Sequence, residues 1–371
     1  MKEELEILKA RDVYEIVPRP KNKNVLGNKW IYTLKRDVTG KIKRYWARLV
    51  AQGFKQIEGL DYFDAFSPVI NFTLVRLFIV ILVTMKGWLC NHLDIKSAYV
   101  YAQLSEGIFM EQPSGFVIDN ENNSVFKLKK ALYGLRQAVY VDDIAIFACN
   151  EKYMNEAISL IKSEFDVKDL GNLSTFLGVE FEMRNGNFIM HQKSYINKMR
   201  NIFGNIPNCK SLVPLSTGIA IYDNKEHYVL NVPYGNLIGS LSFLASRTRP
   251  DIMFAVNFLS QFNNNPTFTH WSLLCQVFHY VPNSPNYAMD LSRSKSFTLT
   301  AYADASWAAD KMDRKSISGY VIFLGDVPVS WSTSKQKCTA LSSMEAEYIA
   351  VSEAVKEIVW LNRIMNSCLF F

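Results

Sequence analysis

The spacing of hydrophobic and polar residues changes several times along the chain, and each change predicts a different element. Two β-prone runs between residues 29 and 51 flank the turn-like residues 37–40, which predicts a β-hairpin rich in basic residues. The longest apolar run, residues 77–85, lies between Arg76 and Lys86. A membrane span needs roughly 20 apolar residues, so we expect a buried helix there and no membrane segment.

Two adjacent carboxylates interrupt the next strand-like region. Residues 139–147 place Asp142 and Asp143 between short β-prone runs, the pattern of a hairpin with acids at its tip. Residues 93–99 begin as a strand and contain Asp94. Neighbouring carboxylates repel unless they are solvated or bridged by cations, and Mg²⁺ prefers oxygen ligands. Taken alone, the pair is more often a polar turn than a metal site.

The second half of the chain changes from a helical to a mixed pattern. Residues 204–234 are a polar connector, and residues 234–279 have helical spacing, with Pro250 opening one of the helices. From residue 297, three strand-like runs precede the helical residues 343–365. This β-β-β-α order is compatible with an α+β or mixed-sheet domain.

The start of that last helix contains two glutamates. Ser342 and Glu345 have the spacing of a capping box, in which the glutamate satisfies backbone groups at the helix start. Glu345 is therefore assigned to the cap, and Glu347 is the candidate for chemistry.

Composition adds a preference for polyanionic partners. The chain has 371 residues, of which 49% are hydrophobic, enough for two or three domains. Its net charge of +6 favours phosphate-bearing partners, although many proteins of this charge bind no nucleic acid. The six cysteines form no CxxC pair, which favours a reducing compartment. The charged N-terminus lacks the apolar core of a signal peptide, so secretion is not expected.

A series of motifs resembles, in one consistent order, the polymerase of copia-type retrotransposons. Tyr140-Val-Asp-Asp143 is the YVDD form of the reverse-transcriptase signature, and residues 92–99 (HLDIKSAY) resemble the family's first catalytic strand. The supporting motifs are residues 45–54 (YWARLVAQGF), 59–69 (GLDYFDAFSPV), 109–116 (FMEQPSGF), 131–138 (ALYGLRQA), 169–179 (DLGNLSTFLGV) and 248–256 (TRPDIMFAV). Residues 302–307 and 340–348 resemble the opening of the family's ribonuclease H domain.

The resemblance implies an α+β fold with reverse-transcriptase fingers, palm and thumb-like regions, followed by a ribonuclease H-like mixed-sheet domain. The implied divisions are a reverse transcriptase at residues 12–204, a connection region at 205–296 and the ribonuclease H-like domain at 297–371. Several dozen palm residues of the family are expected to be missing between Ala138 and Val139. The ribonuclease H-like domain is expected to be truncated at its C-terminus.

The resemblance also implies two metal sites. Asp94, Asp142 and Asp143 would hold two Mg²⁺ ions, with Mn²⁺ as an alternative, for phosphoryl transfer. Asp304 and Glu347 would hold metal in the ribonuclease H-like domain, where the family normally uses four acids.

Three further residues would contact the nucleotide. Arg48 would bind the incoming triphosphate, since its guanidinium group matches phosphate geometry. Tyr99 would lie under the sugar and exclude a 2′-hydroxyl, and Gln137 would lie against the nucleotide. For each of them, the sequence without the resemblance favours ordinary surface or core packing.

Two functions therefore remain open. The first is an RNA-directed DNA polymerase with a ribonuclease H-like tail, which would use an RNA or DNA template-primer and deoxynucleoside triphosphates. The resemblance would place it in the cytoplasm within virus-like particles, or in the nucleus. The second is a catalytically inactive remnant that at most binds nucleic acid, because the Ala138–Val139 junction lacks the segment that supports the catalytic hairpin. An unrelated metal-dependent nuclease would leave the finger and connection motifs unexplained, and the oligomeric state is not predicted.

Overall fold

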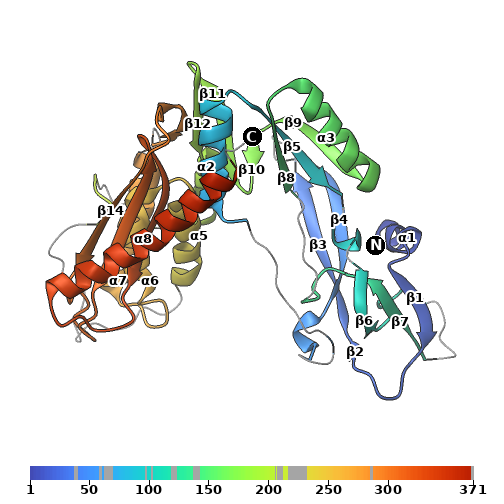
Figure 1. Cartoon of the computed structure of the whole chain (residues 1–371). Coiled ribbons are helices and arrows are strands. Elements are labelled where there is room, and N and C mark those ends of the chain that lie inside the picture. The colour runs from blue at the N-terminus through green and yellow to red at the C-terminus, as the bar shows by residue number, and fades with distance from the viewer. Residues whose placement is uncertain are drawn as a thin grey trace. The chain divides into compact units, whose positions relative to one another are not determined.

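The computed structural model divides the chain into two compact units. It describes residues 1–36, 41–57, 61, 70–96, 98–101, 103–117, 123–136, 143–204, 206, 212–215, 232–284 and 287–368. Unit 1 comprises Met1–Val69, Leu93–Ile144 and Ile158–Leu170, and unit 2 comprises Ile70–His92, Ala145–Ala157 and Gly171–Phe371. Figure 1 shows the helices and strands of both units.

Unit 1 contains a four-stranded sheet, a two-stranded hairpin and an N-terminal helix. The sheet has the order β1-β7-β6-β2. Its strands are β1 (Tyr14–Pro18), β2 (Val25–Leu26), β6 (Gln103–Met110) and β7 (Ser124–Lys130), and the helix is α1 (Lys2–Ala10). Leu8 of α1 packs with Leu49, Ile108 and Phe126 in one hydrophobic core, so α1 is an integral part of this unit.

The predicted hairpin is confirmed. Strands β3 (Asn28–Arg36) and β4 (Ile42–Ala51) pair antiparallel from Asn28↔Ala51 to Arg36↔Ile42. Strand β4 alternates, so that Leu49 is buried while Arg48 on the opposite face is half-buried. The predicted turn at residues 37–40 lies outside the described residues.

The apolar run at residues 77–85 is a buried helical segment, as predicted. Helix α2 (Phe72–Phe78) continues directly into a π-helix, Ile79–Met85. Leu77, Ile79 and Val80 have no exposed surface. Across the described part of the chain, we find no helix with the length and hydropathy of a membrane span.

A three-stranded sheet carries the first predicted acidic residues. Its order is β8-β5-β9, with β5 (Leu89–Ile95), β8 (Asp143–Ala148) and β9 (Val167–Asn172). Helix α3 (Glu151–Glu164) follows β8 in the chain. Strand β5 is therefore hydrogen-bonded to the strand that begins at Asp143.

Unit 2 also contains an antiparallel sheet and a helical cluster. The sheet has the order β10-β11-β12-β13, and its strands are β10 (Thr175–Phe176), β11 (Val179–Arg184), β12 (Asn187–His191) and β13 (Met289–Asp290). The helices are α4 (Lys193–Ile202), α5 (Tyr234–Arg247), α6 (Met253–Ser260) and α7 (Phe268–Asn283). Pro250 opens a short 3₁₀ segment that leads into α6, as its position in the sequence predicts.

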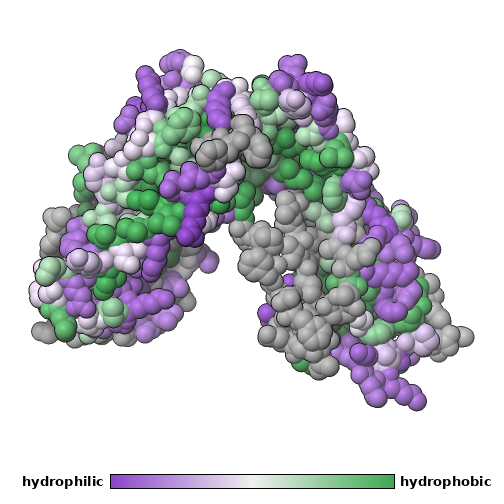
Figure 2. Space-filling model, viewed as in Figure 1, coloured by the Kyte–Doolittle hydropathy of each residue, from purple (hydrophilic) through white to green (hydrophobic). Residues whose placement is uncertain are grey.

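The β-β-β-α prediction for the tail is confirmed. Strands β14 (Leu299–Ser306), β15 (Ile317–Leu324) and β16 (Val327–Lys335) form an antiparallel sheet, and α8 (Ser343–Cys368) lies across it in Figure 1. Val351, Val355 and Val359 remain 43–49% exposed on α8, whose surface shows apolar patches in Figure 2.

The predicted capping assignment is also confirmed. Ser342 Oγ accepts a hydrogen bond from the Glu345 amide at 3.2 Å, and Glu345 Oε2 accepts one from the Leu341 amide at 2.6 Å. Glu345 thus caps the N-terminus of α8.

Arg76 connects three elements inside unit 2. Its guanidinium donates to the carbonyls of Val329 at 2.7 Å and Arg247 at 2.9 Å, and it lies 3.9 Å from the ring centroid of Trp331. Only 3% of Arg76 is exposed. Desolvation lowers its pKa, while the hydrogen bonds to carbonyl groups favour the charged form. The side chain therefore ties α2 to α5 and β16.

We predict that Arg76→Met destabilises the protein by about 3 kcal/mol or more, because it leaves buried carbonyl groups without donors. Urea unfolding measures the difference. Arg293→Met is the matched control, since Arg293 is 72% exposed and its ion pair contributes at most about 1 kcal/mol. Equal losses for both variants would contradict the structural role of Arg76.

Lys335, at the end of β16, binds two carboxylates of the β14–β15 connection. Its Nζ contacts Asp310 and lies 2.9 Å from Asp313 Oδ2. Burial alone would raise the pKa of Asp310, but hydrogen bonds from Lys335 and from the Met312 amide keep that pKa below its ordinary value. The pKa of Asp313 is also lowered, chiefly by its hydrogen bond with Lys335.

We predict that Lys335→Met lowers the unfolding free energy at pH 7 by about 1–3 kcal/mol. Because the carboxyl pKa values are lower in the folded state, this contribution is present above the unfolded carboxyl pKa of about 3.9 and disappears as pH falls below it. Urea unfolding at pH 7 and pH 3 should show the difference narrowing. The exposed Lys337→Met serves as the control and should show little change at either pH. A difference that stays constant with pH would refute the linkage.

Candidate functional site

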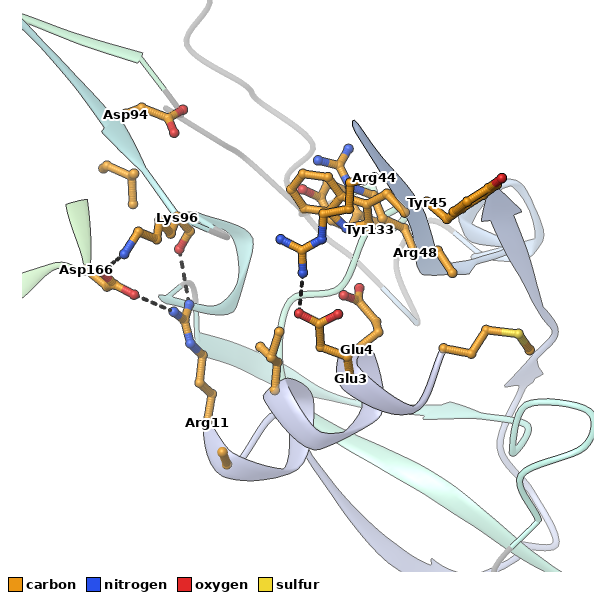
Figure 3. A pocket seen from close by; sticks show the side chains of 16 residues that line it. Glu3, Glu4, Arg11, Arg44, Tyr45, Arg48, Asp94, Lys96, Tyr133 and Asp166 are labelled. Atoms are coloured by element: carbon orange, nitrogen blue, oxygen red, sulfur yellow. Dashed lines mark hydrogen bonds and ion pairs between the residues drawn. The ribbon is translucent and has the colours of Figure 1, made fainter. Parts of the chain in front are cut away.

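Unit 1 contains a cavity of about 510 Å³ that brings together two residues predicted from the sequence. Arg48 from β4 and Asp94 from β5 both line it. Its other charged residues come from α1 and β4, from the residues that directly follow α1 and β5, and from the segment between α3 and β9. Figure 3 shows these side chains around the cavity.

Aromatic rings hold the Arg48 guanidinium. Its central carbon lies 4.9 Å from the ring centroid of Trp46 and 4.6 Å from that of Tyr133. Within the described residues, Arg48 has no carboxylate partner and no hydrogen bond. Ring faces attract a guanidinium group without using its N–H donors. Arg48 is therefore oriented and still able to bind an oxyanion.

A close backbone contact positions Tyr133. The Ala51 amide donates to the Tyr133 carbonyl at 2.7 Å, which joins the end of β4 to this loop. The next residue, Gly134, has a φ of +91°, and a Cβ there would lie 2.2 Å from the Ala51 carbonyl oxygen. Only glycine fits at this contact, so Gly134 sets the distance between Tyr133 and Arg48.

Asp94 is a half-buried carboxylate on β5. Its neighbours Leu93 and Ile95 are buried on the other face of the strand. No hydrogen bond or ion pair binds the Asp94 carboxylate in the described part of the chain. An unpaired, partly desolvated carboxylate of this kind is a suitable ligand for a hard cation.

The predicted metal triad is described only in part. Asp143 is half-buried at the start of β8, the strand hydrogen-bonded to β5. Asp142 lies outside the described residues, so the set of Asp94, Asp142 and Asp143 stays a prediction. Among the residues that are described, no three histidine, cysteine or acidic side chains gather as metal ligands.

The other two predicted nucleotide residues lie partly or wholly outside the described residues. Tyr99 belongs to a 3₁₀ segment, Ala98–Tyr101, which follows β5, and its side chain is not described. Gln137 lies outside the described residues. Their roles remain predictions.

Several charged residues of the cavity were not singled out in the sequence. Lys96 Nζ lies 2.8 Å from Asp166 Oδ1, and Arg11 donates to Asp166 Oδ2 at 3.3 Å. Glu3 of α1 forms an ion pair with Arg44 of β4. Arg44 and Lys96 have a period-2 relation to Arg48 and Asp94, which is a sequence signal for a shared face. Asp166 and Glu3 have no such signal.

Asp304 and Glu347 occupy separate elements of unit 2. Asp304 is exposed on β14 opposite Gly319, and Glu347 is half-buried in the first turns of α8. Neither carboxylate has a hydrogen bond or ion pair in the described part of the chain. They remain candidate ligands without an observed contact between them.

Comparison with known proteins identifies the family. The family model described as "Reverse transcriptase (RNA-dependent DNA polymerase)" matches residues 11–140 and 138–217, together more than half of the chain. The chain belongs to the reverse transcriptases of copia-type retrotransposons. The order of motifs around Tyr140-Val-Asp-Asp143 thus gave the correct family.

Two plant relatives show the extent of the similarity. The chain is 34% identical to the Retrovirus-related Pol polyprotein from transposon RE1 of Arabidopsis thaliana, over 93% of this chain and 26% of that protein. It is 32% identical to the Retrovirus-related Pol polyprotein from transposon TNT 1-94 of Nicotiana tabacum, over 99% of this chain and 31% of that protein. This reverse transcriptase chain therefore spans about a quarter to a third of these relatives.

The reverse transcriptase match comes in two segments that meet at residues 138–140. The alignment with the RE1 protein extends over 390 positions, although only 93% of the 371 residues take part in it. Several dozen positions of the RE1 protein therefore have no counterpart in this chain.

We predict that Gly134→Ala destabilises unit 1 by at least about 2 kcal/mol more than Gly115→Ala does, because the added methyl group must displace the Ala51 carbonyl. Gly115 is the matched control: its φ is +80°, but a Cβ there meets nothing within 4 Å. Both variants carry the cost of a left-handed backbone, about 1–3 kcal/mol. Urea unfolding separates the two effects, and equal losses would mean that the loop adjusts freely.

Proposed function

We propose that the chain is an RNA-directed DNA polymerase that extends a primer by two-metal phosphoryl transfer. One observation supports this most directly: Arg48 and Asp94, neither of which has a hydrogen bond or ion pair among the described residues, line one cavity in unit 1. A nucleoside triphosphate with its Mg²⁺ needs both kinds of group, a cation for the phosphates and an oxygen ligand for the metal.

Arg48 would neutralise the triphosphate of the incoming deoxynucleotide. Its ring contacts with Trp46 and Tyr133 fix the plane of the guanidinium group, which reduces the entropy lost on binding. Tyr99 would exclude a 2′-hydroxyl and Gln137 would contact the nucleotide, both by resemblance to the family.

Asp94, Asp142 and Asp143 would hold Mg²⁺, or Mn²⁺ as an alternative. The half-buried position of Asp94 and the pairing of β5 with β8 fit this donor set. When bound, the two ions would activate the attacking hydroxyl of the primer and stabilise the leaving oxygen. The remaining contribution of the chain is to orient the carboxylates through the β5–β8 ladder.

We further propose that the chain has the three divisions of the family. Fingers, palm and thumb-like regions would occupy residues 12–204, the connection 205–296 and a ribonuclease H-like domain 297–371. The β14–β16 sheet with α8 across it supports the last assignment, and Asp304 and Glu347 would be its metal ligands. The polymerase would act on an RNA or DNA template-primer, in cytoplasmic virus-like particles or in the nucleus.

The family match is divided into two segments near Ala138 and Val139. This division supports the proposal that a stretch of the palm is missing there, which bears on the function. The catalytic strands must then keep their geometry without the helix and strand that normally support them.

We predict that the purified chain extends a primer on an RNA template with Mg²⁺, and that Asp142→Asn combined with Asp143→Asn abolishes incorporation. The substitution removes the metal charge partners while keeping the side-chain size. Circular dichroism and template binding check that both proteins are folded. A folded chain that binds template but incorporates no nucleotide would overturn the proposal in favour of an inactive remnant.

A further inference from the structure

The N-terminal helix places acidic residues against the cavity that contains Arg48. Helix α1 precedes residue 11, where the family match begins, yet Leu8 is only 1% exposed and anchors α1 in the core of unit 1. Glu3 and Glu4 in its first turn both line the cavity. Acidic residues are favourable at this end of a helix, so the position of these carboxylates is locally stable.

Two arginines flank one aromatic ring on β4. The guanidinium carbon of Arg44 lies 5.7 Å from the Trp46 ring centroid, and that of Arg48 lies 4.9 Å from it. Residues 44, 46 and 48 share one face of the strand, since side chains alternate. The cavity thus has a paired guanidinium surface of the kind that suits a chain of phosphates.

The two arginines differ in their partners. Glu3 forms an ion pair with Arg44, and Figure 3 shows its carboxylate directed from α1 toward that guanidinium. Arg48 has only ring contacts in the described residues. A carboxylate on Arg44 occupies donors that a phosphate oxygen would use.

We propose that Arg44 is a second polyphosphate-binding residue of this cavity, and that Glu3 is its internal competitor. A nucleoside triphosphate bound at Arg48 takes over Arg44, and the Glu3 carboxylate is released to solvent. Helix α1 remains anchored through Leu8, so the exchange involves a side chain and not the helix. This inference rests on the proposed function of the cavity, and it adds a regulatory contact to it.

The exchange is energetically modest. The side chains of Arg44 and Glu3 are 55% and 68% exposed. Exposed ion pairs are weak and are screened by salt. Glu3 therefore lowers the affinity for phosphates by a small factor that decreases as the ionic strength rises.

The test measures binding of inorganic tripolyphosphate and of a deoxynucleoside triphosphate to the full chain by calorimetry at low salt. Glu3→Gln should tighten binding about two- to fivefold. The matched control is Glu6→Gln, which removes the same charge from an exposed position of α1 that does not line the cavity. Arg44→Gln should weaken binding, and in that background Glu3→Gln should have no further effect.

Binding by an Arg48 variant distinguishes the competitor role of Glu3 from the role of the cavity as a triphosphate site. Equal affinities of Glu3→Gln and Glu6→Gln, while Arg48→Gln weakens binding, would overturn the competitor role alone. Unchanged binding in Arg48→Gln would instead refute the cavity as the triphosphate site. A thermal melt of each variant confirms that it is folded, which is expected because Glu3 is exposed and Leu8 is unchanged.

Discussion

The contact between the backbones at Ala51 and Gly134 determines the geometry of the candidate site. The hydrogen bond from the Ala51 amide to the Tyr133 carbonyl joins β4 to a loop more than 80 residues later in the chain. Because a side chain at position 134 would collide with the Ala51 carbonyl, the two segments can approach only at a glycine. The Tyr133 ring, and through it the plane of the Arg48 guanidinium, depends on that approach.

Most of the cationic side chains in the cavity are paired with carboxylates. Lys96 and Arg11 share Asp166, and Arg44 pairs with Glu3. Pairing lowers the cost of placing several cations side by side. Arg48 is the exception in the described part of the cavity, because ring faces and not a carboxylate hold it. Several cationic side chains can thus lie together in this cavity without a ligand, and the Arg48 guanidinium still provides one oriented donor group.

The sequence predicted those parts of the fold whose signals are local. The hairpin of β3 and β4, the buried segment at residues 77–85 and the tail of three strands and α8 all follow from periodicity, and the Ser342–Glu345 cap follows from spacing. The π-helical geometry of Ile79–Met85 has no local signal that we can identify.

Contacts between distant segments could not be predicted. Arg76 meets carbonyl groups about 170 and 250 residues away, and Asp166 meets Lys96 across 70 residues. Of the site residues, Arg48 and Asp94 were predicted through family resemblance, and the structure adds that they line one cavity. Residues 137–142 lie outside its description, so the resemblance alone supports Gln137 and Asp142.

The ladder between β5 and β8 joins the two strands that contain Asp94 and Asp143. Asp94 lies near the end of β5, and Asp143 begins β8, so the two carboxylates depend on main-chain hydrogen bonds between these strands. Such bonds form between any two paired strands and do not require a particular connection between them. The register of the two strands nevertheless determines which of their residues face each other. A slip of one position would turn Asp143 to the opposite face of the sheet. The relative position of the two carboxylates therefore depends on strand register, and the burial of Leu93 and Ile95 opposes such a slip on β5.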